Sequence, residues 1–425
     1  MQEIKKINLS LELRKFSELT INFDKERIPL SSSERESKKG KYPYYGAQGI
    51  IDYLDEYIFN GEYLLIAEDG ENLNSRSQPI ANVVSGKFWV NNHAHIVKTN
   101  SECDIHYLCY LLNNTNISGY ITGSAQPKLN QYNLNNMVLE IQDYETQYKI
   151  SKILKGINDK IRLNEEINKN LEQLMKCIFE DWFVNFNYSE DISFKSSELG
   201  EIPSNWNVKK LSDVLITLES GKRPKGGISD IEDGIPSIGA ENILGLGKFN
   251  YSKNKLISHE FFSTLKKGVI QDKDVLLYKD GAQLGRKSLF MKGFPFDICC
   301  INEHVFRLQT NDEINQFYLY LWLDQEVMTN EIINLNSNSA QPGINQNDVK
   351  SLPILVPELK IISKFNKIIS PMMNQIFDNA LEINKLTKLR DTLLPKLMSG
   401  EIDVSKINCD LIIVTFYFYF EILFN

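Results

Sequence analysis

Basic side chains, interleaved with tyrosine, serine, asparagine and glutamine, gather in several stretches of the chain. In the first half they are Arg27, Ser33, Arg35, Lys38, Lys39, Lys41, Tyr44, Asn74 and Arg76. In the second half they are Lys222, Arg223, Lys225, Gln283, Arg286 and Lys287. Lysine and arginine can neutralise phosphates, and arginine, lysine, asparagine and glutamine can hydrogen-bond base edges. A solvated surface has the same composition, so both interpretations stay open at this point.

One of these stretches, GAQLGRKS at 281–288, contains the residue types of a nucleotide-binding P-loop. Its spacing excludes that motif, because three residues separate Gly281 from Gly285 where four are needed. Arg286 also stands between Gly285 and the lysine. The stretch lies between the strand-like runs DVLLY and SLFM, so we predict a basic β-hairpin turn.

Two histidines, His93 and His95, alternate in sequence and would share one face of a strand. Such a pair can ligate a metal, but no acidic or cysteine partner lies nearby at ligand spacing. A simple alignment of the two halves pairs His95 with His304. A histidine that recurs in both halves favours a structural hydrogen-bonding role, and we expect neither a metal nor a cofactor.

Composition narrows the class of protein. The 425 residues are 42% hydrophobic and 24% charged, as in soluble globular proteins of about three domains. A net charge of −8 argues against a general nucleic-acid coat but permits local basic patches. The cysteines form no CxxC pair, which predicts buried thiols in a reducing cytoplasm. We expect no signal peptide and no membrane span, because the apolar tail LIIVTFYFYFEILF is interrupted by Glu421.

The chain repeats itself at about half its length. GSAQPKLN at 123–130 returns as NSAQPGIN at 338–345, an offset of 215 that continues through the following apolar segments. Upstream, Asp69-Gly70 matches Asp280-Gly281 at an offset of 211. Sliding offsets indicate loop-rich β structure, whereas the fixed offset indicates a rigid element. Gln126 and Pro127, and their counterparts Gln341 and Pro342, would mark the junctions between the two, as turn and docking elements.

The spacing of apolar residues predicts that the rigid element is a long helix in each copy. From Tyr148 to about Phe183 the heptad a positions would be Ile150, Ile157, Asn164, Leu171 and Ile178, with Ile153, Ile167 and Leu174 among the d positions. Asp143 would cap this helix, Pro357 would lie in the first turn of its counterpart, and Pro395 and Gly400 would end that second helix. Asn164 and Asn379 occupy the middle a position of each copy. We predict that the helices pack antiparallel with these asparagines close together, fixing the register.

These observations predict an α+β protein with two β-rich domains, separated by two long antiparallel coiled-coil helices and related by a pseudo-twofold repeat. The expected boundaries are residues 1–143 and 188–356 for the domains and 144–187 and 357–400 for the helices. A helix of about 35 residues would span roughly 50 Å. Residues 401–425 form a tail that either adds an edge strand or is an aggregation-prone extension.

The duplicated motifs resemble bacterial type I restriction–modification specificity subunits. The resemblance rests on ERIPLSSSER, KGKYPYYGAQG, NNHAHIVK and GSAQPKLN in the first half, and on GEIPSNWNVKKLSDV, DVLLYKDGAQLGRKSLF, NSAQPGIN and LLPKLMSGEIDVS in the second. It covers nearly all of residues 10–405. The first half departs from it by lacking the IPSNW opening found at 202–206.

The resemblance implies a non-catalytic subunit in which two target recognition domains each read one half of a split double-stranded DNA sequence. The paired helices would act as a ruler and dock two methyltransferase subunits, and restriction–motor subunits would complete the complex. Two other classes of protein compete with this interpretation. A self-contained restriction–methylation enzyme would need cofactor and nuclease motifs that the sequence lacks. A coiled-coil adaptor would not need two β-rich domains with basic loops.

Overall fold

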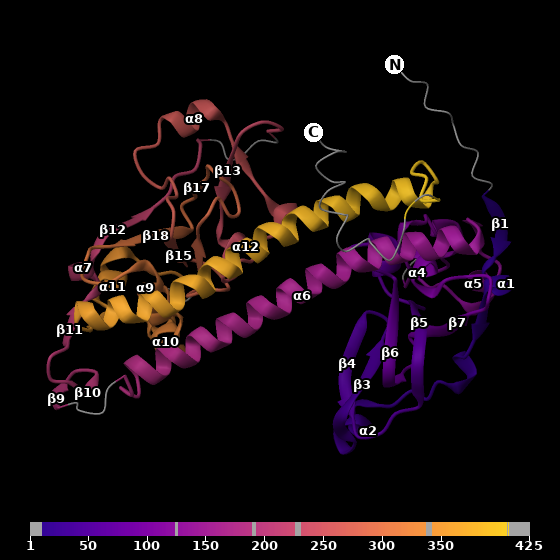
Figure 1. Ribbon diagram of the computed structural model, residues 1–425, viewed down its shortest axis with the longest axis horizontal. Helices are drawn as coiled ribbons and strands as arrows, with labels where there is room; N and C mark the ends of the chain where they lie inside the picture. The colour runs from indigo at the N-terminus through magenta and orange to yellow at the C-terminus, as the bar shows by residue number, and fades with distance from the viewer. Residues whose placement is uncertain are drawn as a thin grey trace. The chain divides into compact units, whose positions relative to one another are not determined.

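The chain folds into two compact units of mixed helix and strand, as the sequence predicted (Figure 1). The computed structural model describes residues 11–123, 126–188, 193–225, 231–336, 342–405 and 407. The first unit contains the chain up to Lys160 and again from Leu386, and the second contains Ile161–Lys385. The limits of the units fall inside the two long helices, whereas the domain limits expected from sequence followed the helix ends.

In the first unit a mixed sheet forms the β-rich body. The strands are β1 (Glu12–Lys15), β2 (Thr20–Asn22), β3 (Lys39–Gly46), β4 (Gly49–Leu54), β5 (Phe59–Ala67), β6 (Ala81–Val90), β7 (Ala94–Thr99) and β8 (Val138–Ile141). The helices are α1 (Phe16–Leu19), η1 (Asp24–Glu26), α2 (Ser32–Ser37), α3 (Asn72–Ser75), α4 (Ile105–Asn114), η2 (Ser118–Tyr120), α5 (Gln131–Asn135) and the beginning of α6 (Tyr144–Phe183). The strand order of the main sheet is β2-β7-β5-β6-β3-β4.

The centre of this sheet is strand β5, which pairs antiparallel with both β6 and β7. Its last residues, Tyr63 to Ala67, are all buried, so this run is apolar on both faces. Phe59, Tyr63 and Phe88 pack with ring centroids 5.4–5.7 Å apart and form an aromatic centre for the core.

The second unit is built in a similar way. Its strands are β9 (Phe194–Ser197), β10 (Gly200–Pro203), β11 (Asn207–Lys210), β12 (Leu215–Ser220), β13 (Ile235–Ile238), β14 (Leu256–Ile257), β15 (Asp274–Tyr278), β16 (Lys287–Phe290), β17 (Cys300–Ile301), β18 (Val305–Thr310) and β19 (Pro353–Val356). Its helices are α7 (Leu211–Val214), η3 (Ala240–Asn242), η4 (Tyr251–Lys253), α8 (His259–Ser263), α9 (Gln316–Asp324), α10 (Glu326–Asn334), α11 (Gln346–Ser351) and most of α12 (Leu359–Met398).

Four strands of each unit share their order, and several backbone hydrogen bonds recur in both units. The order β12-β18-β15-β16 repeats β2-β7-β5-β6. Strand β1 pairs antiparallel with β8, and β11 pairs in the same way with β19. The amide of Phe16 donates to the carbonyl of Met137 at 2.8 Å, and that of Leu211 donates to Leu352 at 2.9 Å. The repeat in the sequence is therefore a repeat of structure.

The ends of the long helices differ in part from the expectation. Asp143 caps α6 as predicted, because its carboxylate accepts from the amide of Thr146 at 3.0 Å. Pro357 precedes α12 instead of lying in its first turn, since the helix begins at Leu359. Pro395 lies inside α12, and Gly400, with a φ of 73°, follows the helix end at Met398.

The buried stripe of α6 leaves the predicted heptad in its second half. Ile150, Ile157 and Asn164 are buried at their expected a positions, but Leu174 is 47% exposed and Met175 beside it is fully buried. The stripe continues through Phe179 and Phe183 with a spacing of four residues. A straight helix of 3.6 residues per turn drifts in this way from a strict seven-residue repeat.

Within the second unit, α6 and α12 run in opposite directions. The ring centroids of Phe183 and Phe365 lie 4.8 Å apart, whereas Asn164 donates to Glu382 at 2.6 Å. Asn379 donates to Asn168 at 2.8 Å. Each central asparagine is thus buried and bonds the opposite helix about one turn away from the other asparagine. Within the first unit, Arg390 donates to Asn158 at 3.2 Å and Gln142 to the carbonyl of Leu397 at 2.8 Å.

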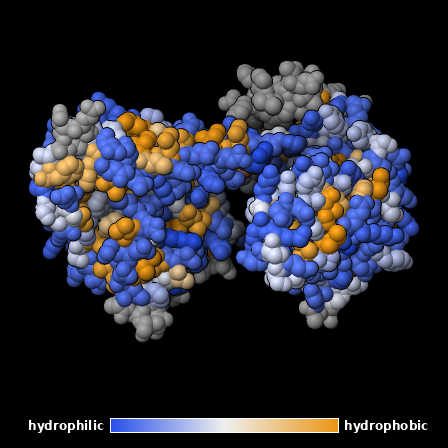
Figure 2. All heavy atoms as spheres, turned by 90° about the horizontal axis from the view of Figure 1, so that it is seen from below, coloured by the Kyte–Doolittle hydropathy of each residue, from blue (hydrophilic) through white to orange (hydrophobic). Residues whose placement is uncertain are grey.

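The surface of both units is mostly hydrophilic with scattered apolar patches (Figure 2). No helix in the described ranges is long and apolar enough to cross a membrane. The thiols of Cys103, Cys109, Cys299 and Cys300 are buried as expected, but Cys177 is exposed. Cys409, with the rest of the apolar tail, falls outside the described residues.

Two residues that weaken helices occupy matched positions of α6 and α12. Gly156 and Pro371 are 215 positions apart, the offset of the repeat. Nothing lies within 4 Å of a Cβ placed on Gly156, and Pro371 is exposed. A proline in a helix interior lacks the amide that would bond the carbonyl four residues earlier.

We expect Gly156→Ala to stabilise the protein by about 1 kcal/mol and Pro371→Ala by up to about 3 kcal/mol, because alanine is the better helix former. Thermal and denaturant unfolding of the two variants measure both effects. A lower unfolding midpoint for Gly156→Ala would contradict the helical environment described here.

Candidate functional site

Each unit contains a histidine–aspartate pair at a matched position. Nδ1 of His93 and Oδ2 of Asp69 are 2.7 Å apart in the first unit. In the second unit, Nδ1 of His304 bonds Asp280 in the same way. His93 and His304 are both partly exposed. The structural partner of His304 is therefore His93, and the predicted match with His95 was wrong by two residues.

His95 is instead a buried residue of the first unit. Its ring nitrogens lie 2.6 Å from Oδ2 of Asp24 and 2.7 Å from the carbonyl oxygen of Leu129. Burial opposes ionisation of Asp24, but the hydrogen bonds that its carboxylate makes with His95 and with the amide of Ile96 keep its pKa below the ordinary value. The predicted structural role describes His95 well, although its counterpart at position 306 is a phenylalanine.

The junction residues after the histidine loops support these pairs through the backbone. The amide of Gly70 donates to the carbonyl of Pro127 at 3.1 Å, and that of Gly281 donates to Pro342 at 2.8 Å. Gln126 is exposed, whereas Gln341 lies outside the described residues. Both prolines thus act as turn elements; their predicted role in docking a partner stays a prediction.

Four of the candidate DNA-contacting side chains bond partners inside the fold, two of them buried and two half-buried, and we withdraw them. Arg27 donates to Glu68 at 2.8 Å and to the carbonyl of Ala94 at 2.7 Å. Tyr44 is 1% exposed and accepts from the amide of Leu30 through its hydroxyl. Arg76 donates to the last carbonyls of α4, at Leu112 and Asn113.

Lys287 is the fourth. Its ammonium bonds the hydroxyl of Thr329 and lies 3.9 Å from Asp324, with only 2% of the side chain exposed. Burial lowers its pKa to about 8. The run GAQLGRKS is otherwise the predicted hairpin turn, because β15 and β16 are antiparallel. Lys287 begins β16, whose four residues are all buried, whereas Gln283 and Arg286 lie in the turn before it and are exposed.

A second group of candidates forms salt bridges near the surface. Arg35 and Lys39 both bond Asp52, at 3.1 and 2.7 Å, and Lys38 bonds Glu56 at 2.8 Å. Exposed pairs of this kind contribute little to stability and can exchange an acidic partner for a phosphate. The candidates that remain exposed at the surface are Ser33, Lys41, Asn74, Lys222, Arg223, Lys225, Gln283 and Arg286.

The structure adds an aromatic–lysine cluster, made of Lys41, Tyr42, Tyr57 and Lys87, that sequence reasoning missed. The rings of Tyr42 and Tyr57 are 5.0 Å apart, and Nζ of Lys87 lies 4.6 Å from the centre of the Tyr57 ring. Such a surface suits contact with nucleic acid through charge and stacking. Its members come from β3, β6 and the loop before β5, so no contiguous motif could have revealed it.

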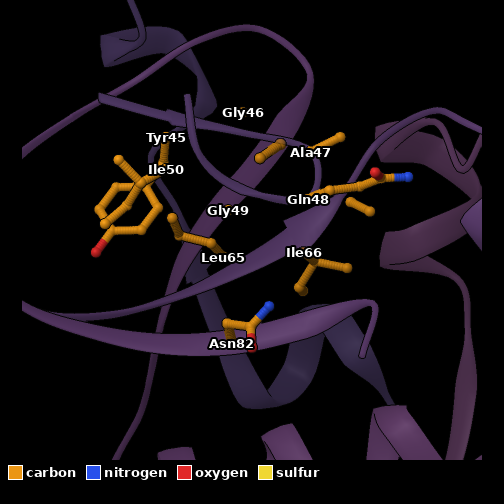
Figure 3. A pocket seen from close by; sticks show the side chains of 11 residues that line it. Tyr45, Gly46, Ala47, Gln48, Gly49, Ile50, Leu65, Ile66 and Asn82 are labelled. Atoms are coloured by element: carbon orange, nitrogen blue, oxygen red, sulfur yellow. The ribbon is translucent and has the colours of Figure 1, made fainter. Parts of the chain in front are cut away.

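A pocket of about 260 Å³ opens in the first unit under the turn between β3 and β4. Its walls include Tyr45, Gln48, Ile50 and Leu65, and Asn82 lies at its base (Figure 3). The lining combines apolar side chains with two amides, which can donate and accept hydrogen bonds. This polar, partly open site adjoins the Asp69–His93 pair, since Gln48 reaches within 3.9 Å of a Cβ placed on Gly70.

The withdrawal of Arg27 predicts a stability effect in place of a binding effect. Arg27→Ala should lower the unfolding free energy by about 2 kcal/mol, because it removes the bonds to the carbonyl of Ala94 and to Glu68, which keeps Lys128 as its remaining salt-bridge partner. Lys41→Ala, which removes an exposed side chain, is the control and should change stability by no more than about 0.5 kcal/mol. Equal unfolding curves for the two variants would contradict this assignment.

The buried Lys287 predicts a dependence of stability on pH. Its folded-state pKa of about 8 is below that of an unfolded lysine, so the unfolded chain binds more protons between about pH 8 and pH 10. The contribution of Lys287 to stability therefore rises with pH across this window.

Replacing Lys287 by methionine removes that dependence. The stability of Lys287→Met relative to the unaltered protein should fall by on the order of 2 kcal/mol between about pH 8 and about pH 10. Denaturant titrations at several pH values measure this difference. A difference that does not change with pH would mean that Lys287 keeps its ordinary pKa.

Comparison with known proteins agrees with the duplicated architecture. The family described as type I restriction modification DNA specificity domain matches residues 12–173 and 203–391. The specificity subunit of the type I restriction enzyme HindI of Haemophilus influenzae is 26% identical over 421 residues, which cover 84% of this chain and 87% of that protein. The MjaIX specificity subunit of Methanocaldococcus jannaschii is 25% identical over 307 residues, which cover 71% and 70% of the two chains.

A solved structure shares the fold. The crystal structure of a type I restriction–modification system S subunit from M. genitalium matches 92% of this chain and 97% of its own, with a TM-score of 0.65 and 16% identity. At 16% identity, this similarity supports a shared fold and no more. Because the two segments that match the family model cover most of its length, the chain belongs to the type I restriction–modification specificity subunit family.

Proposed function

We propose that this chain recognises a bipartite DNA target, with each unit reading one half-site. The observation that carries the proposal is the pair of units with the same strand order and backbone bonds but different exposed side chains. Similar scaffolds suit two segments of the same duplex, and different side chains suit two different base sequences. An unread gap between the half-sites would correspond to the part of the duplex between the reading surfaces.

In this proposal the long helices act as a ruler that sets the distance between the two half-sites. Each is 40 residues long, which corresponds to about 60 Å at 1.5 Å per residue. They would pack as an antiparallel coiled coil under a pseudo-twofold relation. Asn164 and Asn379 would fix the register, since their buried amides bond the opposite helix in the second unit.

The exposed basic side chains supply the contacts to DNA phosphates in this proposal. In the second unit Lys222, Arg223 and Lys225 crowd one loop, and all three are exposed. Gln283 and Arg286 project from the β15–β16 turn. In the first unit the aromatic–lysine cluster and the salt-bridged Lys38 and Lys39 offer the corresponding charges. Because phosphate contacts carry no sequence information, we assign these residues to affinity and orientation.

The subunit would act without a catalytic site of its own. Two methyltransferase subunits would dock on the helices and on the junctions at Pro127 and Pro342, and restriction–motor subunits would join them in the cytoplasm. The family supports this division of labour, because its curated relatives are named as specificity subunits of restriction enzymes.

Lengthening the ruler tests the proposal. Seven residues inserted after Lys160 in α6 and another seven after Lys385 in α12 add two turns, or about 10 Å, to each helix. In a complex with its methyltransferase subunits, the methylated motif mapped by genome sequencing should keep both half-sites and gain about three base pairs of gap, at about 3.4 Å per pair.

The control inserts the same seven residues in the β9–β10 turn at Leu199, outside the long helices, and should leave the gap unchanged. A gap of constant length in the lengthened variant would refute the ruler. A continuous motif in the unaltered complex would refute bipartite recognition itself.

A further inference from the structure

Two loops meet in each unit at matched positions. We call them the junction loops: residues 45–48 and 91–93 in the first unit, and 238–241 and 302–304 in the second. The amide of Asn91 donates to the carbonyl of Tyr45 at 3.0 Å, and that of Asn302 donates to Ile238 at 2.9 Å. The backbone therefore holds both pairs of loops in the same arrangement.

The histidines lock these loops to the Asp-Gly turns in the same way. The amide of His93 donates to the side chain of Asn91 at 2.8 Å, and His304 donates to Asn302 at 2.9 Å. The carbonyl of His93 accepts from Glu68 at 2.9 Å, and that of His304 accepts from Lys279 at 3.1 Å. With the aspartate pairs, these contacts define a scaffold that occurs once in each unit.

The side chains on this common scaffold differ in one consistent way. Gln48 and Glu241 are matched, since both follow the paired strand residue by three positions, and Asn92 and Glu303 each precede the histidine. The first unit thus presents two exposed amides, and the second presents two partly exposed carboxylates. The scaffold is repeated, but the chemistry that it displays changes from amide to carboxylate.

The carboxylates of the second unit lie beside basic residues. Glu241 bonds Lys255 at 2.6 Å, and Glu303 lies 3.7 Å from Arg223 and 3.4 Å from His304. Burial alone would raise the pKa of Glu241, but the bond from Lys255 keeps it below the ordinary value. Glu303 therefore lies next to Arg223, which the proposed function places at the DNA surface, and Glu241 lies next to Lys255.

The space around the loops differs as well. In the first unit the loop of Gln48 covers the open pocket that reaches Asn82 (Figure 3). Asn82 faces Leu65 across the sheet, and the corresponding partner of Leu276 is Ser288. The hydroxyl of Ser288 accepts from the amides of Leu244 and Gly245 at 3.1 Å each. The backbone of these two residues therefore fills the corresponding space in the second unit.

The two side-chain types recognise different base edges. A glutamine or asparagine amide both donates and accepts, which matches N7 and the N6 amino group of adenine. A carboxylate only accepts, and the phosphates of DNA repel it. A carboxylate next to a duplex is therefore favourable only when it accepts a hydrogen bond from an amino group, such as N4 of cytosine.

We propose that the junction loops are base-reading elements: Gln48 and Asn92 read an adenine in one half-site, and Glu241 and Glu303 read a cytosine in the other. This inference rests on the proposed bipartite recognition and adds which residues discriminate and which base each chemistry takes. Arg223 and Lys255 offset the repulsion between the carboxylates and the DNA backbone.

Exchanging the chemistry between the units tests the inference. In complexes with the methyltransferase subunits, methylated motifs are mapped for Gln48→Glu, for Glu241→Gln and for the unaltered protein. Gln48→Glu should lower methylation at the original motif by about 10-fold or more and change one base pair of one half-site only, since a good base contact discriminates by about that factor. Glu241→Gln should change one base pair of the other half-site.

Two further variants separate readout from folding. Gln48→Ala removes the amide without adding charge and should make the same base pair degenerate. Asn60→Asp makes an amide-to-carboxylate change at the opposite, exposed end of β5 and should leave the motif unchanged. Unfolding midpoints of the variants verify that each remains folded.

The outcomes distinguish this inference from the function on which it rests. A bipartite motif that stays the same in Gln48→Glu, Gln48→Ala and Glu241→Gln would overturn the assignment of the junction loops and leave bipartite recognition intact. A half-site read by the first unit that consists only of G·C pairs, or one read by the second that consists only of A·T pairs, would also overturn it. A motif without two half-sites would instead refute the proposed function.

Discussion

The contacts of the buried asparagines between α6 and α12 are the constraint on which the rest of the second unit depends. Asn164 and Asn379 are at most 4% exposed, and each finds its partner on the other helix, at Glu382 and Asn168. A buried amide without a partner costs roughly 1–3 kcal/mol, so a slip of one turn would be penalised twice. The apolar neighbours alone would tolerate such a slip, because one aliphatic side chain replaces another at little cost. Under the proposed register role, these polar contacts would select one register for a helix pair that hydrophobic packing holds together.

The repeated β-rich bodies are held in a different way, mainly through backbone groups. The bonds from Gly70 to Pro127 and from Gly281 to Pro342 join the same turns in the two units, although the side chains around them differ. Backbone bonds place few demands on side-chain type beyond the glycines, which adopt φ of 109° and 122° at these turns. The positions beside them are consequently free to vary without loss of the scaffold. This freedom is what allows one fold to display amides in one unit and carboxylates in the other.

The elements that depend on local pattern could be predicted from the sequence. The duplication, both long helices, the cap at Asp143 and the hairpin at 281–288 follow from repeats, periodicity and turn residues. The heptad in the second half of α6 could not be predicted, because packing against the core of the second unit selects Met175 and Phe179 over Leu174. The match of His304 to His93 was missed because the offset slides through the loops, and only the shared bonds to Asp69 and Asp280 align them.

The environment of each basic side chain could not be predicted from the sequence for the same reason. In sequence Arg27, Lys39 and Lys41 belong to one basic stretch, but the fold half-buries the first against Glu68, pairs the second with Asp52 and leaves the third near Tyr42. Residues that are distant in the sequence decide which of these environments each side chain has. A local sequence pattern does not identify those residues. The consequence for the proposed function is physical: acidic neighbours within the chain already neutralise much of the basic stretch. With a net charge of −8, the chain is better suited to discriminate between base sequences than to hold DNA by charge alone. Under the proposed function the remaining affinity would come from the methyltransferase subunits docked on the helices, which would couple recognition by this chain to assembly of the complex.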